Sequence, residues 1–332
     1  MKKIIIHVGA GKTGTTALQV FFKENEKHFL NQGFAFPVTG RAGRKDAIAH
    51  HKLCDWGPYN DGASLQRWAE IASQHSESTL IVSSEVFHSK ISEPDGRAFF
   101  QELRRACNGR QILVVMYIRR QSHWLQSAYA QWVKSELNSR SITELVSHYK
   151  KHLADQAIRF GEVFGKENVV IRPYEKSQFS GGSIFQDFAE VIDLKWSEEL
   201  LNIPKRNENP RMTADALELK RRMNSFASSA SDLRFVEKCL LDYSHIASKG
   251  GTKEAFSTHS IMPRALIEKI ESESAPLYRI LAQEFLGRED GRLFYEHIEA
   301  PESEERPKSL DQLDDMPDSV IFLLVEMVKR LS

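Results

Sequence analysis

Residues 7–16 of this chain read His-Val-Gly-Ala-Gly-Lys-Thr-Gly-Thr-Thr. They follow a short apolar run that ends at Val8, and they lead into apolar residues with helical spacing over Thr15–His28. The order of strand, glycine-rich loop and helix predicts the first unit of a parallel α/β sheet. At the start of such a helix the backbone N–H groups are unpaired and the helix dipole is positive, so the loop is a candidate anion site.

The side chains of this loop also suit an anion. Its glycines allow a phosphate to approach the main chain, and Lys12 adds a positive charge. Thr15 and Thr16 supply hydroxyl donors at the same place. A tight glycine turn without a ligand is the alternative, but it leaves a lysine and three threonines among three glycines unexplained. We therefore expect residues Gly11, Lys12, Thr13, Gly14, Thr15 and Thr16 to bind a phosphate-like group.

The loop differs from the Walker A motif, G-x-x-x-x-G-K-[ST], of ATP and GTP hydrolases. An alignment on Gly11-Lys12 places Ile6 where the first glycine belongs. An alignment on Gly9 and Gly14 places a threonine where the lysine belongs. An ordinary nucleotide hydrolase is therefore disfavoured.

Further apolar runs along the chain predict the rest of the sheet. The β-rich runs are Lys3–Val8, Thr79–Ser83, Gln111–Ile118 and Asn168–Arg172, and Gly33–Pro37 adds a short edge strand. Helical patterns between them cover Thr15–His28, Ala63–Gln74, Gly96–Cys107 and Ser122–Leu137. Alternating strands and helices predict an α/β fold with helices on both faces of a parallel sheet and with its sites at the C-terminal ends of the strands.

The second half of the chain is predicted to be mostly helical. The clearest helical patterns cover Ala214–Phe226, Leu233–Ile246 and Pro263–Phe285. Residues 299–318 are rich in Pro, Glu and Asp, a linker composition, and an amphipathic helix follows over residues 319–332. We expect an α/β domain over residues 1–298 and a terminal helix that docks on it, with a partner-binding helix as the alternative.

The composition excludes several classes of protein. The chain has 332 residues, 45 Lys+Arg against 45 Asp+Glu, and 41% hydrophobic residues, which is typical of a globular protein. A balanced charge disfavours a nucleic-acid coat or a binder of anionic membranes. Three scattered cysteines without a CxxC motif, no run of 18 apolar residues and no signal-peptide cleavage site indicate a cytoplasmic protein without a transmembrane segment.

A second anion-binding feature follows the third predicted strand. This strand ends in Arg119-Arg120, and a helical stretch with Ser127 comes next. A guanidinium at the strand end and a hydroxyl in the second helical turn can converge on one phosphate. Neighbouring parallel strands deliver their C-terminal loops to the same crevice, so Arg119 and Ser127 are expected to lie near the first loop.

The two features together resemble the cytosolic-type sulfotransferases, which use 3′-phosphoadenosine 5′-phosphosulfate (PAPS). The resemblance rests on Lys12–Thr16 and on Arg119 with Ser127. It extends more loosely to Asn168–Glu175 and Leu286–Phe294, and so covers roughly residues 1–296. The chain lacks the C-terminal dimer motif of the animal enzymes, so a homo-oligomer is left open.

The resemblance implies roles for these residues. Lys12–Thr16 would hold the 5′-phosphosulfate, and Arg119 and Ser127 the 3′-phosphate. Lys12 would stabilise charge on the leaving phosphate oxygen, and no metal is required because this lysine, N–H groups and hydroxyls can carry that charge. The expected reaction transfers a sulfuryl group to a hydroxyl of a carbohydrate or another small molecule, and leaves 3′,5′-adenosine bisphosphate (PAP).

The acceptor must lose a proton as it attacks, so a base should lie near the sulfuryl group. Glu85 follows the predicted strand Thr79–Ser83 and therefore faces the same crevice. Glu85 is the expected base, and His88 is the second candidate. The alternative, non-catalytic role for Glu85 is that of a salt-bridge partner of Arg119 or Lys12. Residues 37–62 lie where an acceptor-binding insertion would fall, and their pattern does not identify the acceptor.

Two other functions fit parts of the pattern. A kinase or other phosphotransferase with a degenerate loop would use ATP and would need no Arg119. A non-catalytic nucleotide-binding protein would keep the pocket without a base. Binding of PAPS or of ATP separates a sulfotransferase from a kinase. The effect of replacing Glu85 separates either enzyme from a non-catalytic protein.

Overall fold

A computed structural model describes residues 2–42, 48–107, 109–149, 152–204, 212–249, 261–298 and 315–331. The chain divides into two compact units. The first combines residues 1–120, 151–207 and 274–296, and the second combines residues 121–150, 208–273 and 297–332. Because residues 299–314 lie outside the described ranges, the predicted linker and the domain limits at 298 and 318 stay predictions.

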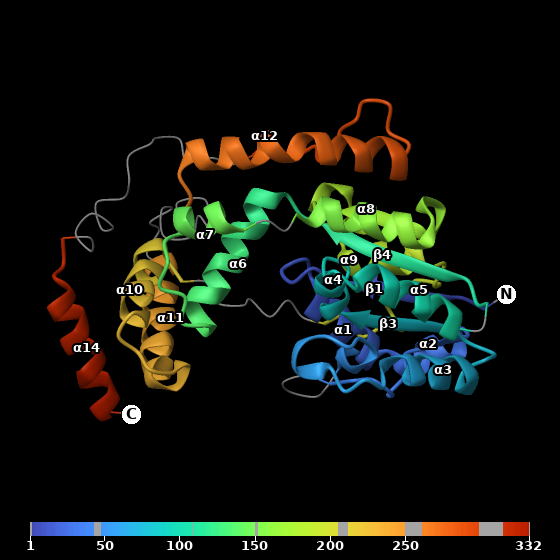
Figure 1. Cartoon of the computed structure of the whole chain (residues 1–332), viewed down its shortest axis with the longest axis horizontal. Coiled ribbons are helices and arrows are strands. Elements are labelled where there is room, and N and C mark those ends of the chain that lie inside the picture. The colour runs from blue at the N-terminus through green and yellow to red at the C-terminus, as the bar shows by residue number, and fades with distance from the viewer. Residues whose placement is uncertain are drawn as a thin grey trace. The chain divides into compact units, whose positions relative to one another are not determined.

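The first unit contains a five-stranded sheet (Figure 1). Its strands are β1 (Ile4–Val8), β2 (Phe34–Ala35), β3 (Thr79–Ser84), β4 (Ile112–Ile118) and β5 (Val169–Pro173), in the order β2-β3-β1-β4-β5. Every neighbouring pair is parallel, which confirms the predicted α/β fold. Val8 pairs with Ser84 and His7 with Val115, so β1, β3 and β4 end at one edge of the sheet.

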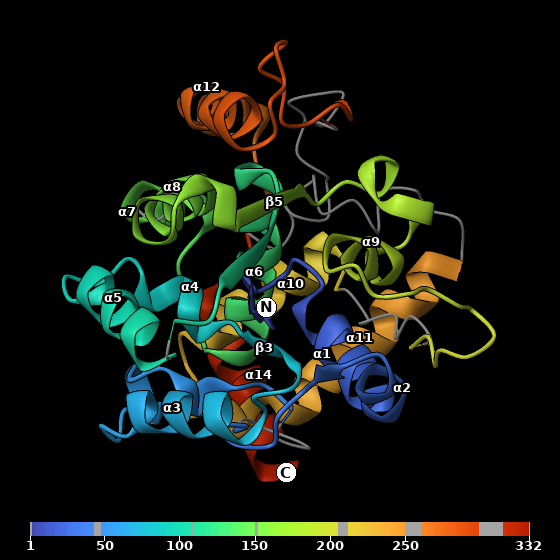
Figure 2. The same ribbon diagram turned by 90° about the vertical axis from the view of Figure 1, so that its right-hand side faces the viewer.

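Helices cover both faces of this sheet (Figure 2). On one face lie α1 (Thr15–Glu24), α2 (Glu26–Asn31) and α9 (Ile184–Val191). On the other face lie α3 (Ser64–Gln74), α5 (Gly96–Ala106) and α8 (Leu153–Phe164). The short helix α4 (Val86–Lys90) follows β3, and short 3-10 turns occur at His51–Leu53, Gly57–Tyr59, Lys166–Asn168, Lys176–Gln178 and Ser180–Gly182.

One predicted helix is wrong in extent. The helix expected over Thr15–His28 breaks at Asn25, whose side-chain amide donates to the carbonyls of Phe21 and Asn202, each at 2.8 Å. An Asn that bonds nearby carbonyls competes with the helical ladder, so α1 ends and α2 begins there. The helix expected over Pro263–Phe285 is confirmed: α12 (Arg264–Ile280) continues into a π-helical turn at Leu281–Phe285.

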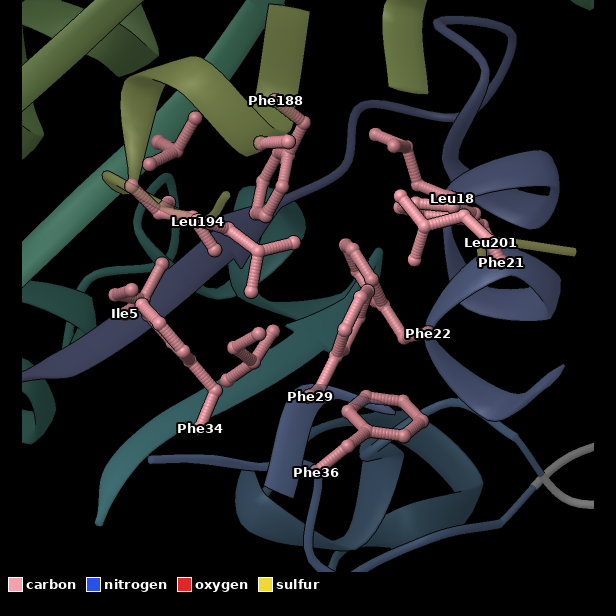
Figure 3. Packing of buried hydrophobic residues seen from close by; sticks show 14 of the residues in the cluster. Ile5, Leu18, Phe21, Phe22, Phe29, Phe34, Phe36, Phe188, Leu194 and Leu201 are labelled. Carbon is pink, nitrogen blue, oxygen red and sulfur yellow. The ribbon is translucent and has the colours of Figure 1, made fainter. Parts of the chain in front are cut away.

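An aromatic core joins α1, α2 and α9 to the sheet (Figure 3). Phe21, Phe22, Phe29 and Phe188 are at most 1% exposed, and the rings of Phe22 and Phe188 lie 4.9 Å apart. Full burial of one such side chain contributes about 1.5–3 kcal/mol. This packing holds α1 against the sheet and so fixes the direction in which the loop before it opens.

The second unit is helical, as predicted for the later part of the chain. It contains α6 (Gln121–Ser135), α7 (Ile142–His148), α10 (Ala214–Asn224), α11 (Arg234–Lys249), α14 (Asp318–Leu331), a 3-10 turn at Ala230–Leu233 and the first part of α12. Ile321 and Val325 of α14 are fully buried against Met223, Leu233 and Val236. Within the described ranges, no helix has both the length and the apolar character needed to cross a membrane.

Asp187 of α9 connects that helix to two strands through hydrogen bonds and an ion pair. Its carboxylate accepts hydrogen bonds from the Tyr117 hydroxyl on β4 at 2.8 Å and from the Ser180 N–H at 2.9 Å. It also pairs with the Arg172 guanidinium on β5, whose Nε lies 3.0 Å away. Asp187 is 1% exposed, so these partners replace the water that its charge loses on folding.

We expect Asp187→Ala to lower the free energy of unfolding by about 3–5 kcal/mol, because it leaves the Arg172 charge and the Tyr117 hydroxyl without their buried partner. The matched control is Glu162→Ala, since Glu162 pairs with Arg97 at 3.5 Å on the surface and should contribute less than ~1 kcal/mol. Guanidinium unfolding followed by tryptophan fluorescence measures both values. Equal losses in the two variants would contradict a stabilising role for Asp187.

Candidate active site

The loop from Gly9 to Gly14 connects β1 to α1 at the C-terminal edge of the sheet. Its backbone is left-handed at Lys12 (φ 69°) and at Gly14 (φ 79°). A glycine adopts this conformation readily, but a lysine pays about 1–2 kcal/mol for it. Among the described residues, Leu137 and Asp193 are the other non-glycine residues with a positive φ, and such strained residues are enriched at functional sites.

Three hydrogen bonds converge on the Ala10 carbonyl inside the loop. The Thr13 N–H and hydroxyl donate to it at 3.2 and 2.5 Å, and the Thr15 hydroxyl lies 3.3 Å away. Gly9 makes this arrangement possible, because a Cβ at that position would lie 2.2 Å from Thr15 Cγ2. Thr13 and Thr15 are buried and hold the loop together, whereas Thr16 is exposed.

The N-terminus of α1 opens onto this loop. Gly14 is the N-cap and has no side chain with which to cap the helix, and the first turn contains no acidic residue. The first hydrogen bond of the helical ladder runs from the Leu18 N–H to the Gly14 carbonyl at 3.0 Å. The N–H groups that precede Leu18 therefore have no acceptor within the helix, which gives an anion donors and a positive dipole end.

Arg119 brings the end of β4 to the same loop. Its Nη1 donates to the Lys12 carbonyl at 3.2 Å, and its guanidinium lies 5.8 Å from the centre of the Tyr174 ring. Tyr174 also packs against the loop, since a Cβ on Gly14 would lie 3.3 Å from its Cε2. The structure thus places Lys12 and Arg119 together; Tyr174, which follows β5, is a neighbour that the sequence analysis missed.

Ser127 lies on α6 in the second unit, whereas the glycine loop and Arg119 belong to the first. It is half-buried in its own unit. The convergence of Arg119 and Ser127 on one phosphate therefore stays a prediction.

Glu85 follows β3 directly and is the residue before α4. The pairing of Ser84 with Val8 brings it beside the end of β1. Gln19 of α1 donates to Glu85 Oε2 at 3.3 Å, so the helix that follows the glycine loop also contacts the expected base. Burial raises the pKa of Glu85 above its usual value, and the hydrogen bond from Gln19 opposes part of that shift.

His88, the alternative base, lies on α4 and is 7% exposed. Its backbone carbonyl accepts a hydrogen bond from Gln156 of α8 at 2.9 Å. Glu85 is the more accessible of the two, at 30% side-chain exposure. The geometry therefore favours Glu85 for contact with a substrate.

Two buried histidines meet at Ser83, the residue of β3 on the α1 face. His7 Nδ1 lies 2.8 Å from the Ser83 hydroxyl, which also accepts a hydrogen bond from Gln19 at 3.2 Å. The Ser83 N–H donates to His50 Nδ1 at 3.2 Å. Burial lowers the pKa of both His7 and His50 to about 3, so each imidazole is neutral near pH 7.

His51 lies next to the expected base. Its Nε2 is 3.8 Å from Glu85 Oε2, and its Nδ1 is 2.7 Å from the Ser84 hydroxyl. Tyr59 covers the imidazole, with ring centres 4.7 Å apart. Burial lowers the pKa of His51 to about 4. The sequence signal was the adjacent pair His50-His51 in segment 37–62, whose pattern did not identify a role. Only the folded structure shows that both residues contact β3 and that His51 lies beside Glu85.

Metal-ligating groups do not gather in this site. Throughout the part of the chain that the structure describes, no three His, Cys, Asp or Glu side chains lie close enough together to hold a metal ion.

Comparisons with known proteins give two distant likenesses. No family model matches the chain. An uncharacterized protein of Archaeoglobus fulgidus is 30% identical over 148 residues, a stretch that spans 44% of this chain and 38% of that protein. The crystal structure of a sulfotransferase from Alicyclobacillus acidocaldarius covers 72% of this chain and 96% of its own, with a TM-score of 0.38 and 17% identity. Neither likeness assigns this chain to a family.

We expect Gly9→Ala to lower the free energy of unfolding by ~1–3 kcal/mol, because its Cβ would overlap the Thr15 side chain. Gly11→Ala is the control in the same loop. A Cβ there would have no neighbour within 4 Å among the described residues, so we expect a change within ~0.5 kcal/mol. Scanning calorimetry compares the two variants. Equal destabilisation would mean that the Thr15 contact does not shape the loop.

Proposed function

We propose that this protein transfers a sulfuryl group from PAPS to a hydroxyl of a carbohydrate or another small-molecule acceptor. The observation that carries the proposal is the hydrogen bond from Arg119 to the Lys12 carbonyl. It joins the cation at the end of β4 to an anion-binding loop that departs from the Walker A pattern. Glu85 lies at the neighbouring strand end, so cofactor-binding and base functions share one edge of the sheet.

In this proposal the residues of the loop hold the 5′-phosphosulfate. Lys12 and the first N–H groups of α1 supply positive charge, and Thr16 offers an exposed hydroxyl. The Thr15 hydroxyl lies 3.3 Å from the Ala10 carbonyl, which already accepts two shorter hydrogen bonds from Thr13. This hydroxyl can therefore turn to a phosphate oxygen at small cost. Arg119 and Ser127 would bind the 3′-phosphate, which distinguishes PAPS from ATP.

The reaction requires little of the protein beyond positioning, charge and one proton acceptor. The acceptor oxygen bonds to sulfur as the bond between sulfur and the 5′-phosphate oxygen breaks. Glu85 takes the hydroxyl proton, and Lys12 stabilises the charge that develops on the leaving phosphate oxygen. Burial raises the pKa of Glu85, which makes it a stronger base than an exposed carboxylate.

Thermal unfolding in the presence of PAP, of ADP, or of ATP with Mg²⁺ tests which nucleotide the protein binds. At 100 times its dissociation constant a ligand stabilises by ~2.7 kcal/mol, which should raise the midpoint by roughly 5 °C. We expect this rise with PAP alone, because ADP lacks the 3′-phosphate that Arg119 and Ser127 would read.

Lys12→Ala and Arg119→Ala should each weaken PAP binding in this assay, whereas Lys52→Ala, which removes an exposed lysine, should leave it unchanged. A rise with ATP alone would replace the proposal with a phosphotransferase. No rise with any of the three would favour a fold that has lost nucleotide binding.

The variant Glu85→Gln tests whether Glu85 is the base. We expect a ~10²–10⁴-fold loss of turnover with PAP affinity retained, because the amide keeps the shape of the side chain but accepts no proton. The wild-type rate should fall as the pH drops through the raised pKa of Glu85, and this acid limb should vanish in the variant. Glu77→Gln, an exposed carboxylate before the same strand, is the control.

An unchanged rate in Glu85→Gln would remove Glu85 from the mechanism. His88→Gln would then be the variant to test, since His88 is the other group expected to act as the base.

A further inference from the structure

We infer that His51 contacts the acceptor hydroxyl together with Glu85, so that the two side chains orient the attacking oxygen. This inference rests on the proposed function and adds an acceptor-binding residue to it. It assigns a role to residues 48–59, whose place in the site the sequence pattern left undefined.

His50 anchors this segment to the end of β3. Its N–H donates to the Ser83 carbonyl at 2.8 Å, and its Nδ1 accepts from the Ser83 N–H at 3.2 Å. Because Nδ1 accepts, the proton lies on Nε2, which donates to the Pro37 carbonyl at 2.8 Å. His50 is fully buried, so these bonds form away from water and fix the residue that follows.

The ring of His51 is held on two sides. Tyr59 packs on its face, and the Ser84 hydroxyl meets its Nδ1 at 2.7 Å. The Ser84 oxygen already accepts from the Val86 N–H at 3.3 Å, and its own proton is available to Nδ1. His51 then carries its proton on Nε2, the nitrogen that faces the Glu85 carboxylate, where a negative charge favours a proton over a lone pair.

The gap between the two side chains fits one oxygen atom. Nε2 of His51 and Oε2 of Glu85 are 3.8 Å apart, which is too far for a direct hydrogen bond. One oxygen can nevertheless lie about 2.8 Å from both atoms, at the apex of a triangle. A hydroxyl at that point accepts the N–H of His51 and donates its proton to Glu85.

This contact leaves the hydroxyl one free direction for attack. One lone pair accepts from His51, the O–H bond points to Glu85, and the remaining lone pair bonds to sulfur. As the bond from sulfur to the 5′-phosphate oxygen breaks, its electrons stay on that oxygen and the hydroxyl proton moves to Glu85. The proton of His51 stays in place, so His51 orients the acceptor and Glu85 is the base.

Burial keeps His51 neutral, although the Glu85 carboxylate lies 3.8 Å from its Nε2. Burial lowers the pKa of the imidazole to about 4. At neutral pH it therefore carries one proton and acts as a hydrogen-bond donor without a positive charge.

Two substitutions separate this role from a structural one. His51→Gln keeps an N–H donor near the position of Nε2, whereas His51→Asn keeps a polar atom only near Nδ1, beside Ser84. With PAPS as donor and water as acceptor, we expect His51→Asn to lower the rate of PAP release by ~10-fold or more and His51→Gln to stay within ~3-fold of wild type. PAP affinity should be unchanged in both. The reverse order, or equal rates in both variants and wild type, would overturn the inference.

A second measurement does not depend on turnover. In protein labelled with ¹⁵N-histidine and bound to PAP, two-dimensional NMR reports which nitrogen of His51 carries the proton, with His51→Gln identifying the signal. We expect the neutral form protonated at Nε2, and protonation at Nδ1 would overturn the inference. Absence of PAP binding by the wild type would instead reject the proposed function, so the two failures are distinguishable.

Discussion

The central position of β1 in the parallel sheet is the constraint on which the rest of the structure depends. β1 pairs with β3 on one side and with β4 on the other, in a register that ends all three strands at one edge. Residues that are 70 to 110 positions apart in the chain thereby become neighbours. Glu85 and Arg119 directly follow β3 and β4, and Lys12 lies in the loop after β1, so the hydrogen bonds of the sheet place all three residues at one edge.

A second constraint is the burial of polar groups beneath this edge. His7, Ser83, Gln19 and His50 are each at most 3% exposed, and their hydrogen bonds join β1, β3, α1 and the segment after β2. Low pKa values keep the two imidazoles neutral, which avoids the cost of a buried charge. The result is a buried polar layer at the ends of β1 and β3, in which Gln19 also donates to Glu85.

Much of the first unit followed from local patterns. Short apolar runs predicted the strands, and the run of glycines, Lys12 and threonines predicted the loop. The break at Asn25 did not follow, because the carbonyl of Asn202 that holds its side chain lies far along the chain. The hydrogen bonds of the Thr13 and Thr15 hydroxyls to the Ala10 carbonyl did not follow either, because they depend on the conformation of the folded loop.

The sequence by itself determined the α/β class, the order of strand, glycine loop and helix around Lys12, and the strand ends that Glu85 and Arg119 follow. These properties depend on neighbours within a few residues, through strand periodicity and the N–H groups of a helix start. Only the tertiary structure decided that Arg119 bonds the Lys12 carbonyl and that His51 comes within 3.8 Å of Glu85. Such contacts arise from strand order and from the anchoring of His50 on β3, and no local spacing encodes either.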